Sequence, residues 1–541
     1  MKGLCLCLAL LFPLGPSPAA QQTEPVYRIS GVVIDAATRA PVAHAELAIS
    51  ASGEETKTTS GEDGRFVFQG VEPGKYPLFA GAQGYVREGY NQHGAFLTAV
   101  AVGSGLDSEH IILRLHRQAV IAGRVTDEHG EAVRHAAVML FANDKANGRH
   151  AISVRAQTQT NDLGEYRFGH LHAGKYYVAV QAQPWYAQST FSYLREPQLV
   201  APPSTPIVGK QDSGLDVVFP ITFYPGAREE HAATELNLTP GDVQVANIQL
   251  QSVPAVHLRL TSLPADAERG ITIQATQKLF GSSSMPVSAQ SAQIAPGEYE
   301  VTGLPPGEVT LIVNGGGNQE QHSRTIKANV SGGEILDTAE AGGLANVSGR
   351  VNFPAGEVIP AQARLMLFTD DGQSASASLW KDGTFSFAPL QEGTYKVMVN
   401  SPVGDEYVKS ISATGAKISG RVITVASTGD VQMNITMARG QGDVTGLAKL
   451  DGKPAAGMMV LLAPASGQNL EGDFRMDQSD SDGTFALHAI TPGRYFLLAI
   501  EDGWGLEWTN AAVLKPYLQN AQPLQISPND QLKVSVDVQG K

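Results

Sequence analysis

The chain carries one short pattern of glycine and aromatic residues five times, and this repeat limits the folds open to it. Two glycines stand ten residues apart in each copy: Gly64 and Gly74, Gly164 and Gly174, Gly297 and Gly307, Gly383 and Gly393, Gly483 and Gly493. An aromatic residue follows each first glycine by two positions: Phe66, Tyr166, Tyr299, Phe385 and Phe485. A fixed internal spacing is the mark of a repeated supersecondary unit, so we expect five copies of one structural element.

The first copy shows what this element is. Phe66 and Phe68 point to one face of a strand, because strand side chains alternate with a period of two. The preceding Asp63 and Gly64 are typical of a tight turn, and Pro73-Gly74 predicts a second turn. A second strand then begins with Tyr76. Each copy therefore predicts a strand–turn–strand hairpin whose aromatic side chains face a core.

A second element precedes the hairpin in most copies. Ile29-Ser30-Gly31-Val32-Val33 has counterparts at 121–125, 347–351 and 444–448, and a weak one at 256–260. With the alternating stretches after each hairpin, about seven short strands fall in every ~100 residues, which is typical of an antiparallel β-sandwich. A chain of 541 residues is also too long for one hydrophobic core. We predict an all-β fold of about five sandwiches in tandem.

These residues resemble the carboxypeptidase regulatory-like domain family, and the best match pairs Ile121–Val125 with Thr160–Tyr176. The resemblance implies transthyretin-like antiparallel β-sandwich domains. Its relation to starch-binding-like sandwiches favours carbohydrate binding. The catalytic zinc domain of metallocarboxypeptidases has a His-x-x-Glu motif that none of the 13 histidines begins. We therefore expect no enzyme activity.

The repeat and the N-terminus together predict how the chain is divided. Lys2, the apolar run Leu4–Leu14 and the small residues to Ala20 predict a signal peptide and export. The predicted divisions are a signal peptide at 1–20 and sandwiches at 21–117, 118–253 with an aromatic insertion at 183–225, 254–341 in degenerate form, 342–440 and 441–541.

Charge and cysteine content narrow the partners. The formal net charge is −14, and an acidic chain is a poor partner for nucleic acid or an anionic membrane. No later run of about 18 apolar residues predicts a membrane span. Both cysteines, Cys5 and Cys7, fall in the expected signal peptide, so we expect an exported chain without disulfides or thiolate metal sites.

Two short motifs raise the question of a metal. His170 and His172 flank an inward Leu171, and Asp477–Gly483 loosely resembles a calcium loop without its distal glutamate. The simpler interpretations, which we favour, are solvated histidines and the same turn as in the other copies. We therefore predict no catalytic residue, no metal and no cofactor.

Three groups of aromatic residues outside the repeat are candidates for stacking on a sugar. The first holds Trp185, Tyr186 and Tyr193, the second Trp504 and Trp508, and the third Tyr85 and Tyr90. The alternative is that these rings pack between sheets or domains.

The leading hypothesis is an exported, non-catalytic protein that binds a glycan through loop aromatics. The first alternative is a structural or adhesive spacer that contacts cell-surface or extracellular proteins. The second is an undetected hydrolase in the second sandwich. Exposure of Trp185, Trp504 and Trp508 would favour sugar binding, whereas their burial between domains would favour the spacer.

Overall fold

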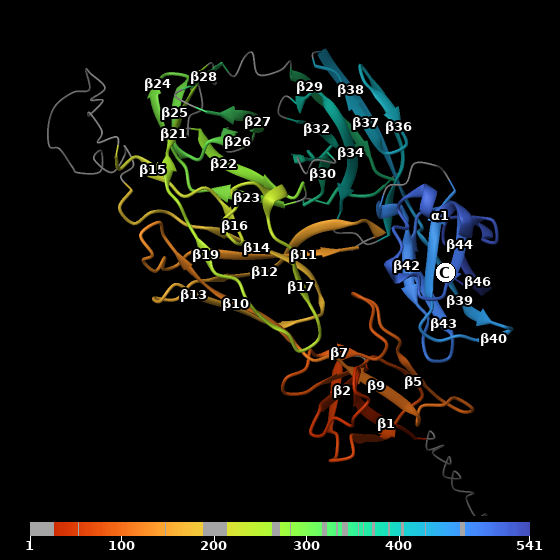
Figure 1. Ribbon diagram of the computed structural model, residues 1–541. Helices are drawn as coiled ribbons and strands as arrows, with labels where there is room; N and C mark the ends of the chain where they lie inside the picture. The colour runs from red at the N-terminus through yellow and green to blue at the C-terminus, as the bar shows by residue number, and fades with distance from the viewer. Residues whose placement is uncertain are drawn as a thin grey trace, which may run out of the picture.

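The computed structural model describes the chain from residue 26 to residue 540, apart from several internal gaps. The gaps are residues 52, 146–147, 188–213, 262–270, 282, 316–321, 332–333, 338–343, 355, 361, 370–373, 388–389, 402–404, 428 and 466–470. The expected signal peptide lies outside the described residues. Strands dominate the rest, as predicted (Figure 1). Five hydrophobic clusters each lie within one sandwich, which we number one to five in chain order.

Sandwich one encloses the cluster from Ile29 to Leu115. One sheet has the order β4-β1-β9 and the other β3-β2-β6-β7, while β5 and β8 form a separate ribbon. The strands are β1 Tyr27–Asp35, β2 Glu46–Ala51, β3 Glu54–Thr59, β4 Arg65–Val71, β5 Gly74–Tyr76, β6 Leu78–Gly81, β7 Glu88–Gly89, β8 Val100–Val102 and β9 Ile111–Leu115.

One sheet of sandwich two has the order β13-β10-β18, and β19 also pairs with β10. The other sheet has the order β12-β11-β14-β16, and β17 also pairs with β14. Strands β15 and β20 form a separate ribbon. Its strands are β10 Ala119–Thr126, β11 Ala137–Asp144, β12 Ala151–Gln159, β13 Glu165–Leu171, β14 Gly174–Gln181, β15 Val217–Val218, β16 Thr222–Phe223, β17 Leu236–Leu238, β18 Val243–Val245, β19 Ile248–Gln249 and β20 Val253–Pro254.

Sandwich three has the sheets β24-β25-β21-β28 and β23-β22-β26-β27. Its strands are β21 Val256–Thr261, β22 Thr272–Leu279, β23 Ser283–Val287, β24 Gln290–Ala295, β25 Glu298–Leu304, β26 Gly307–Gly315, β27 His322–Val330 and β28 Glu334–Asp337.

Sandwich four has the sheets β32-β29-β38-β35, with β33 also on β29, and β31-β30-β34-β37-β36. Its strands are β29 Leu344–Asn352, β30 Arg364–Phe368, β31 Ser374–Ser378, β32 Thr384–Ser386, β33 Leu390–Gln391, β34 Gly393–Asn400, β35 Glu406–Thr414, β36 Lys417–Ser419, β37 Val422–Val425 and β38 Gly429–Arg439.

Sandwich five differs because its last strand, β46, pairs with both β39 and β44 and joins the two sheets. A helix, α1 Ala511–Leu518, follows β44, and the side chain of Asn510 caps its first turn. The strands are β39 Gly442–Leu450, β40 Lys453–Pro454, β41 Met459–Pro464, β42 Arg475–Gln478, β43 Thr484–Ile490, β44 Gly493–Ile500, β45 Gln522–Ile526 and β46 Gln531–Gln539.

The predicted strand–turn–strand unit is present in every copy, but the prediction that its two strands form a hairpin is wrong. The strands do not pair with each other: in sandwich two, for example, β13 pairs with β10 in one sheet and β14 pairs with β11 in the other, so the unit crosses from sheet to sheet over the core. The first aromatic residue and its partner two positions later are buried, as Phe66 and Phe68 show at 4% and 3% exposure. The tyrosines of the second strand are also buried, and each donates its hydroxyl to the carbonyl four residues earlier, as Tyr76 does to Glu72 at 3.0 Å. The same bond recurs at Tyr176, Tyr395 and Tyr495, so the ring both fills the core and holds the turn above it.

One feature of the sheets departs from the antiparallel prediction. The first and last strands of each sandwich pair in parallel: β1 with β9, β10 with β18 and β19, β21 with β28, β29 with β38, and β39 with β46. Apart from β44 with β46, the other pairs are antiparallel, as expected. Parallel strands cannot be joined by a tight turn and need a long connection. The first and last strands of a sandwich meet this condition, because all its other strands lie between them in the sequence.

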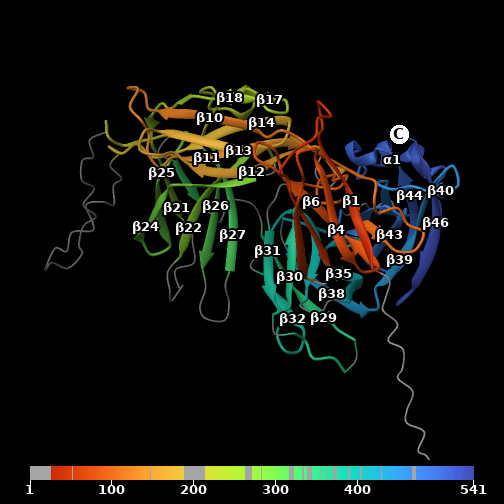
Figure 2. The same ribbon diagram turned by 90° about the horizontal axis from the view of Figure 1, so that it is seen from below.

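The sandwiches do not extend in a line. Figures 1 and 2 show sandwich one beside sandwich five, although they are the first and last along the chain. Hydrogen bonds join the two directly, among them Ser481 N to Ala99 O at 3.0 Å. The string expected from the repeat is therefore folded back on itself.

Candidate functional site

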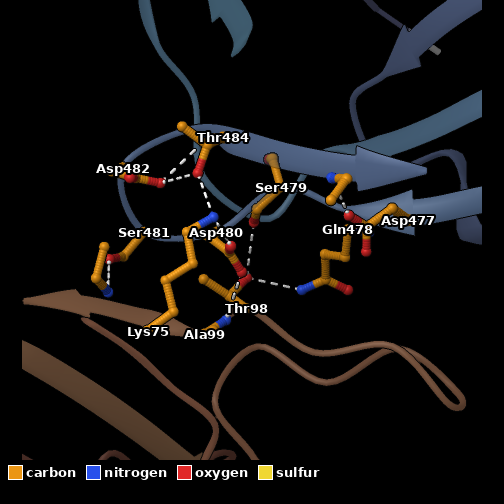
Figure 3. Close-up of polar contacts among 12 residues, drawn as sticks. Lys75, Thr98, Ala99, Asp477, Gln478, Ser479, Asp480, Ser481, Asp482 and Thr484 are labelled. Carbon is orange, nitrogen blue, oxygen red and sulfur yellow. Dashed lines mark hydrogen bonds and ion pairs between the residues drawn. The ribbon is translucent and has the colours of Figure 1, made fainter. Parts of the chain in front are cut away.

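The contact between sandwiches one and five is the most developed polar site between distant parts of the chain (Figure 3). We call it the latch. Its first half is Lys75 on β5 together with residues 91–101, which lead into β8. Its second half is the turn Gln478–Thr484 between β42 and β43, which contains all but the first residue of the motif that resembled a calcium loop.

Local structure explains why sandwich one presents this surface. Pro77 has no N–H to donate, and the predicted second hairpin strand is broken there into β5 and β6. β5 pairs with β8, as the equivalent residues of sandwiches two, four and five pair with β17, β37 and β45, and this pairing places Lys75 directly opposite Ala101. Both residues reach the turn of sandwich five: the Lys75 ammonium bonds Asp480, and Ala101 N donates to the Ser481 hydroxyl at 2.8 Å.

Asp480 is the charged centre of the latch. One carboxylate oxygen accepts from Lys75 Nζ at 2.5 Å and the other from Ala99 N at 3.0 Å. Burial raises the pKa of Asp480 above its ordinary value, although the Lys75 hydrogen bond acts in the opposite direction. The carboxylate is therefore held at some cost in desolvation, and Lys75 offsets part of that cost.

The remaining turn residues extend this network. Lys75 Nζ also donates to Thr484 Oγ1 at 2.6 Å, and that hydroxyl donates to Asp482 at 2.5 Å. The Lys75 ammonium thus supplies a positive charge to the acidic turn, on Asp480 and beside Asp482. Among the residues that the structure describes, no group of three His, Cys, Asp or Glu side chains could hold a metal ion.

Gln478 and Thr98 form the buried part of the latch, with 1% and 0% exposure. Gln478 Nε2 donates to Thr98 Oγ1 at 2.8 Å and to Asn91 O at 2.6 Å. Its Oε1 lies 3.1 Å from His93 Nδ1. Burying a side-chain amide is unfavourable unless its groups are paired, and here both ends are.

Sandwich five also contacts sandwich two. Lys145 Nζ donates to Gly505 O at 2.8 Å, and Thr509 Oγ1 donates to Gly148 O at 2.7 Å. Gly148 lies against the ring of Trp508, where a Cβ atom would come within 2.3 Å of the indole. The C-terminal sandwich therefore contacts sandwiches one and two in addition to its neighbour in the chain, sandwich four.

The sandwich junctions contain further specific contacts. At the first, Glu88 lies 3.0 Å from His116 Nδ1 and 3.4 Å from His172 Nδ1. At the second, Phe280 of sandwich three packs against Phe141, Tyr177 and Phe223 of sandwich two. At the fourth, Arg421 and Asp473 form an ion pair. His172 is thus part of a junction contact while its side chain remains 44% exposed.

The predicted sugar-stacking residues fall into different environments. Trp504 stacks on His93 with a 4.8 Å centroid distance, Trp508 is buried against Phe474, and Tyr85 donates to Asp35. Tyr90 is half-buried beside the core of sandwich one. Trp185 is 83% exposed with Tyr186 against its edge, whereas Tyr193 lies outside the described residues. Among the candidates that the structure describes, no ring contact joins one of the three groups to another.

Sequence reasoning missed the latch residues Lys75, Thr98 and His93, and it assigned Asp480 to a simple turn. A signal was present: the stretch Asp477–Gly483 has three acidic residues, whereas the aligned stretches of the other copies have at most two. Nothing local identified Lys75 as its partner, because the two are separated by 405 positions.

Comparison with known families settles the nature of the first two sandwiches. Residues 28–106 and 120–218 match the family model of the carboxypeptidase regulatory-like domain. Sandwiches one and two are carboxypeptidase regulatory-like domains. This confirms the resemblance inferred from the motifs of these copies, and the three later sandwiches share their strand–turn–strand unit. No curated protein matches the chain.

Solved structures similar to the chain include two pilins and one further bacterial protein. A streptococcal ancillary pilin is 11% identical over 52% of this chain and 98% of its own, with a TM-score of 0.21. The TIE protein of Bacillus anthracis is 11% identical over 77% and 75%, with a TM-score of 0.18. The major pilin BcpA of Bacillus cereus is 11% identical over 59% and 99%, with a TM-score of 0.13.

No helix among the described residues has the length and apolar character needed to cross a bilayer.

Proposed function

We propose that this protein is an exported, non-catalytic structural module that holds its sandwiches in a closed arrangement and presents contacts to other proteins. The observation that carries the proposal is the latch, in which a buried amide, an ion pair and backbone hydrogen bonds join the first and last sandwiches. A flexible string of domains has no need for buried, hydrogen-bonded side chains that join its first and last domains. A scaffold that must keep one shape does need them, because they fix the positions of its ends.

The fate of the candidate aromatic residues supports this role over sugar binding. Trp504 and Trp508 contact sandwiches one and two, so their ring faces are occupied by the chain itself. Tyr85 is engaged with Asp35 and with Arg117 over its ring. These rings serve packing between and within sandwiches, the alternative that the sequence left open.

Closure can be tested with an engineered disulfide. Ala101→Cys and Ser481→Cys, in a background with Cys5 and Cys7 replaced by serine, should cross-link within one chain on oxidation. The cross-linked chain should keep the small-angle scattering radius of the unmodified protein. Single-cysteine variants are the matched control. A radius that shrinks on cross-linking would show that the native chain is open, contrary to the proposal.

A second candidate function, glycan binding, is favoured by one observation. The indole of Trp185 is 83% exposed, and Tyr186 is fixed beside it by a hydrogen bond to Glu128. An exposed indole held by a second ring is the kind of platform on which the apolar face of a sugar stacks.

A glycan array separates the two candidates. The structural role predicts that neither the wild-type chain nor Trp185→Ala binds any glycan. Binding that is lost in Trp185→Ala but retained in Trp380→Ala, a control at another exposed tryptophan, would instead establish the sugar site.

A further inference from the structure

The latch joins two different surfaces, and this has a consequence for assembly. The surface of sandwich one contributes Lys75, Thr98 and Ala101, and that of sandwich five contributes Gln478, Asp480 and Ser481. A contact between two different surfaces is called heterologous. All its hydrogen bonds can form within one chain, and the same bonds can form between sandwich five of one copy and sandwich one of another.

The latch is also specific for the fifth turn. Asp480 stands three positions before the first glycine of its copy, and no other copy has a carboxylate there. The corresponding residues are Gly61, Asn161, Ile294 and Trp380. Lys75 therefore has a matching carboxylate in sandwich five alone, so neither surface fits another sandwich of the same chain equally well.

Both surfaces can be separated without exposing a core. The contact is made mainly by charged, hydroxyl and amide groups, which water can satisfy when the surfaces part. Asp480 additionally regains its hydration, because its burial in the latch is unfavourable to the charge. Separation would also uncover the rings of Trp504 and Phe96, which pack against each other, and Trp504 Nε1 has no hydrogen-bond partner in the closed form.

We propose that the partner of each latch surface, when the contact within one chain is released, is the complementary latch surface of a second copy. The proposal rests on the proposed scaffold role, since it names the protein that the scaffold contacts. Within one chain the effective concentration of the two surfaces is on the order of millimolar or more, so closure dominates in dilute solution. Exchange between copies takes over where the chains are crowded or where closure is blocked.

Reversing one charge on each side tests this. Lys75→Glu and Asp480→Lys each place like charges together, so each variant alone should be open, with an increased scattering radius, and monomeric by light scattering. The double variant Lys75→Glu/Asp480→Lys in one chain should close again. An equimolar mixture of the two single variants should form a 1:1 dimer, because both contacts between the copies then join opposite charges.

A covalent measurement accompanies the mixture. Ser481→Cys is added to the Lys75→Glu chain and Ala101→Cys to the Asp480→Lys chain, both without Cys5 and Cys7. Oxidation of the mixture should give a disulfide-linked dimer, and each chain with its cysteine alone should not. Unchanged thermal unfolding midpoints would show that both chains are folded.

The outcomes separate the two proposals. Single variants that open, with a mixture that stays monomeric and without the cross-link, would overturn exchange between copies while leaving the closed scaffold intact. Single variants that remain as compact as the wild type would overturn the latch itself, and both proposals with it.

Discussion

The carbonyl oxygen of Ala246 lies 2.1 Å from the position that a Cβ atom on Gly123 would occupy. Ala246 belongs to the segment that runs parallel to β10 at the end of sandwich two, so this glycine is required by the parallel pairing. Gly31, Gly349 and Gly446 meet a backbone oxygen of the last strand in the same way, at 2.0, 1.8 and 2.5 Å. The glycine of the first-strand motif is thus explained by close approach of two backbones.

Gly123→Ala should therefore destabilise sandwich two by about 1–3 kcal/mol or more, because β10 and the segment around Ala246 must separate. Denaturant unfolding followed by circular dichroism measures the effect. Gly472→Ala is the matched control, since Gly472 has no atom within 4 Å of its Cβ position. Equal effects of the two substitutions would contradict the explanation.

The tyrosines of the strand–turn–strand unit give a second prediction. Tyr495→Phe keeps the buried ring but removes the hydroxyl that donates to Thr491 O at 2.6 Å. The expected loss of stability is about 0.5–1.5 kcal/mol, the usual contribution of one such bond. Tyr517→Phe, on helix α1, is a comparison at a partly buried tyrosine outside the repeat. A null result in unfolding experiments would mean that the ring alone accounts for the tyrosine.

The same tyrosine predicts an alkaline limit. Burial raises the pKa of Tyr495 from 10.0 to about 12. The folded chain holds this proton more tightly than the unfolded chain, so the stability it contributes is complete below pH 10 and is lost as the pH rises towards 12. Ultraviolet titration should show the ionisation of Tyr495, taken as the difference between wild type and Tyr495→Phe, only near pH 12.

Acid should act on the junction of sandwiches one and two. Burial raises the pKa of Glu88, but hydrogen bonds from His172 and His116 outweigh it and hold the pKa below its ordinary value of 4.5. The stability that the carboxylate contributes is therefore present above pH 4.5 and is lost as the pH falls through the lowered value. Glu88→Gln should lower the unfolding midpoint at pH 7 and flatten its dependence on acid.

Glu109→Gln is the control for Glu88, because the exposed pair that Glu109 makes with Arg28 is expected to contribute little.

The latch should respond to acid differently from the junction of sandwiches one and two. Since the pKa of Asp480 is raised, mild acid protonates it more readily in the closed form than in the open form. The scattering radius should therefore not increase between pH 7 and pH 5, and an opening in that range would refute this.

The contact between sandwiches two and five gives a last prediction. Gly148→Ala would bring a methyl group into the Trp508 ring, and Gly148 also has a positive φ of 69°, which alanine adopts only with strain. The substitution should loosen the attachment of sandwich five and raise the hydrogen exchange of Thr509, whose N–H bonds Gly148 O. Gly130→Ala, also at positive φ but with no neighbour at the Cβ position, separates the strain from the clash.

The sequence was sufficient for what depends on local pattern. Alternation placed Phe66 and Phe68 on one buried face, and turn chemistry placed Gly64 between two strands. These features follow from the backbone geometry of a few consecutive residues.

The division of the chain into domains at residues 118, 254, 342 and 441 stays a prediction, although the hydrophobic clusters are consistent with it.

The latch was not predictable in this way. The turn Asp480–Gly483 has the composition of an ordinary tight turn, and its role depends on Lys75 and Thr98, which a different sandwich supplies. Parallel pairing of β1 with β9 was missed for the same reason, because Gly31 reveals a close backbone approach but not the direction of the strand that approaches. Contacts between segments that are far apart in the chain leave no repeating pattern of residues in a single sequence.

Parallel first and last strands mean that the polypeptide enters each sandwich at one end and leaves it at the other. Duplicating or deleting one unit would preserve this polarity, so copy number could change by simple recombination without disturbing any single core. The contact between sandwiches one and five is different, because it depends on the angles at all the junctions between consecutive sandwiches. Variants with one unit more or fewer would keep the cores and lose the encounter between their ends.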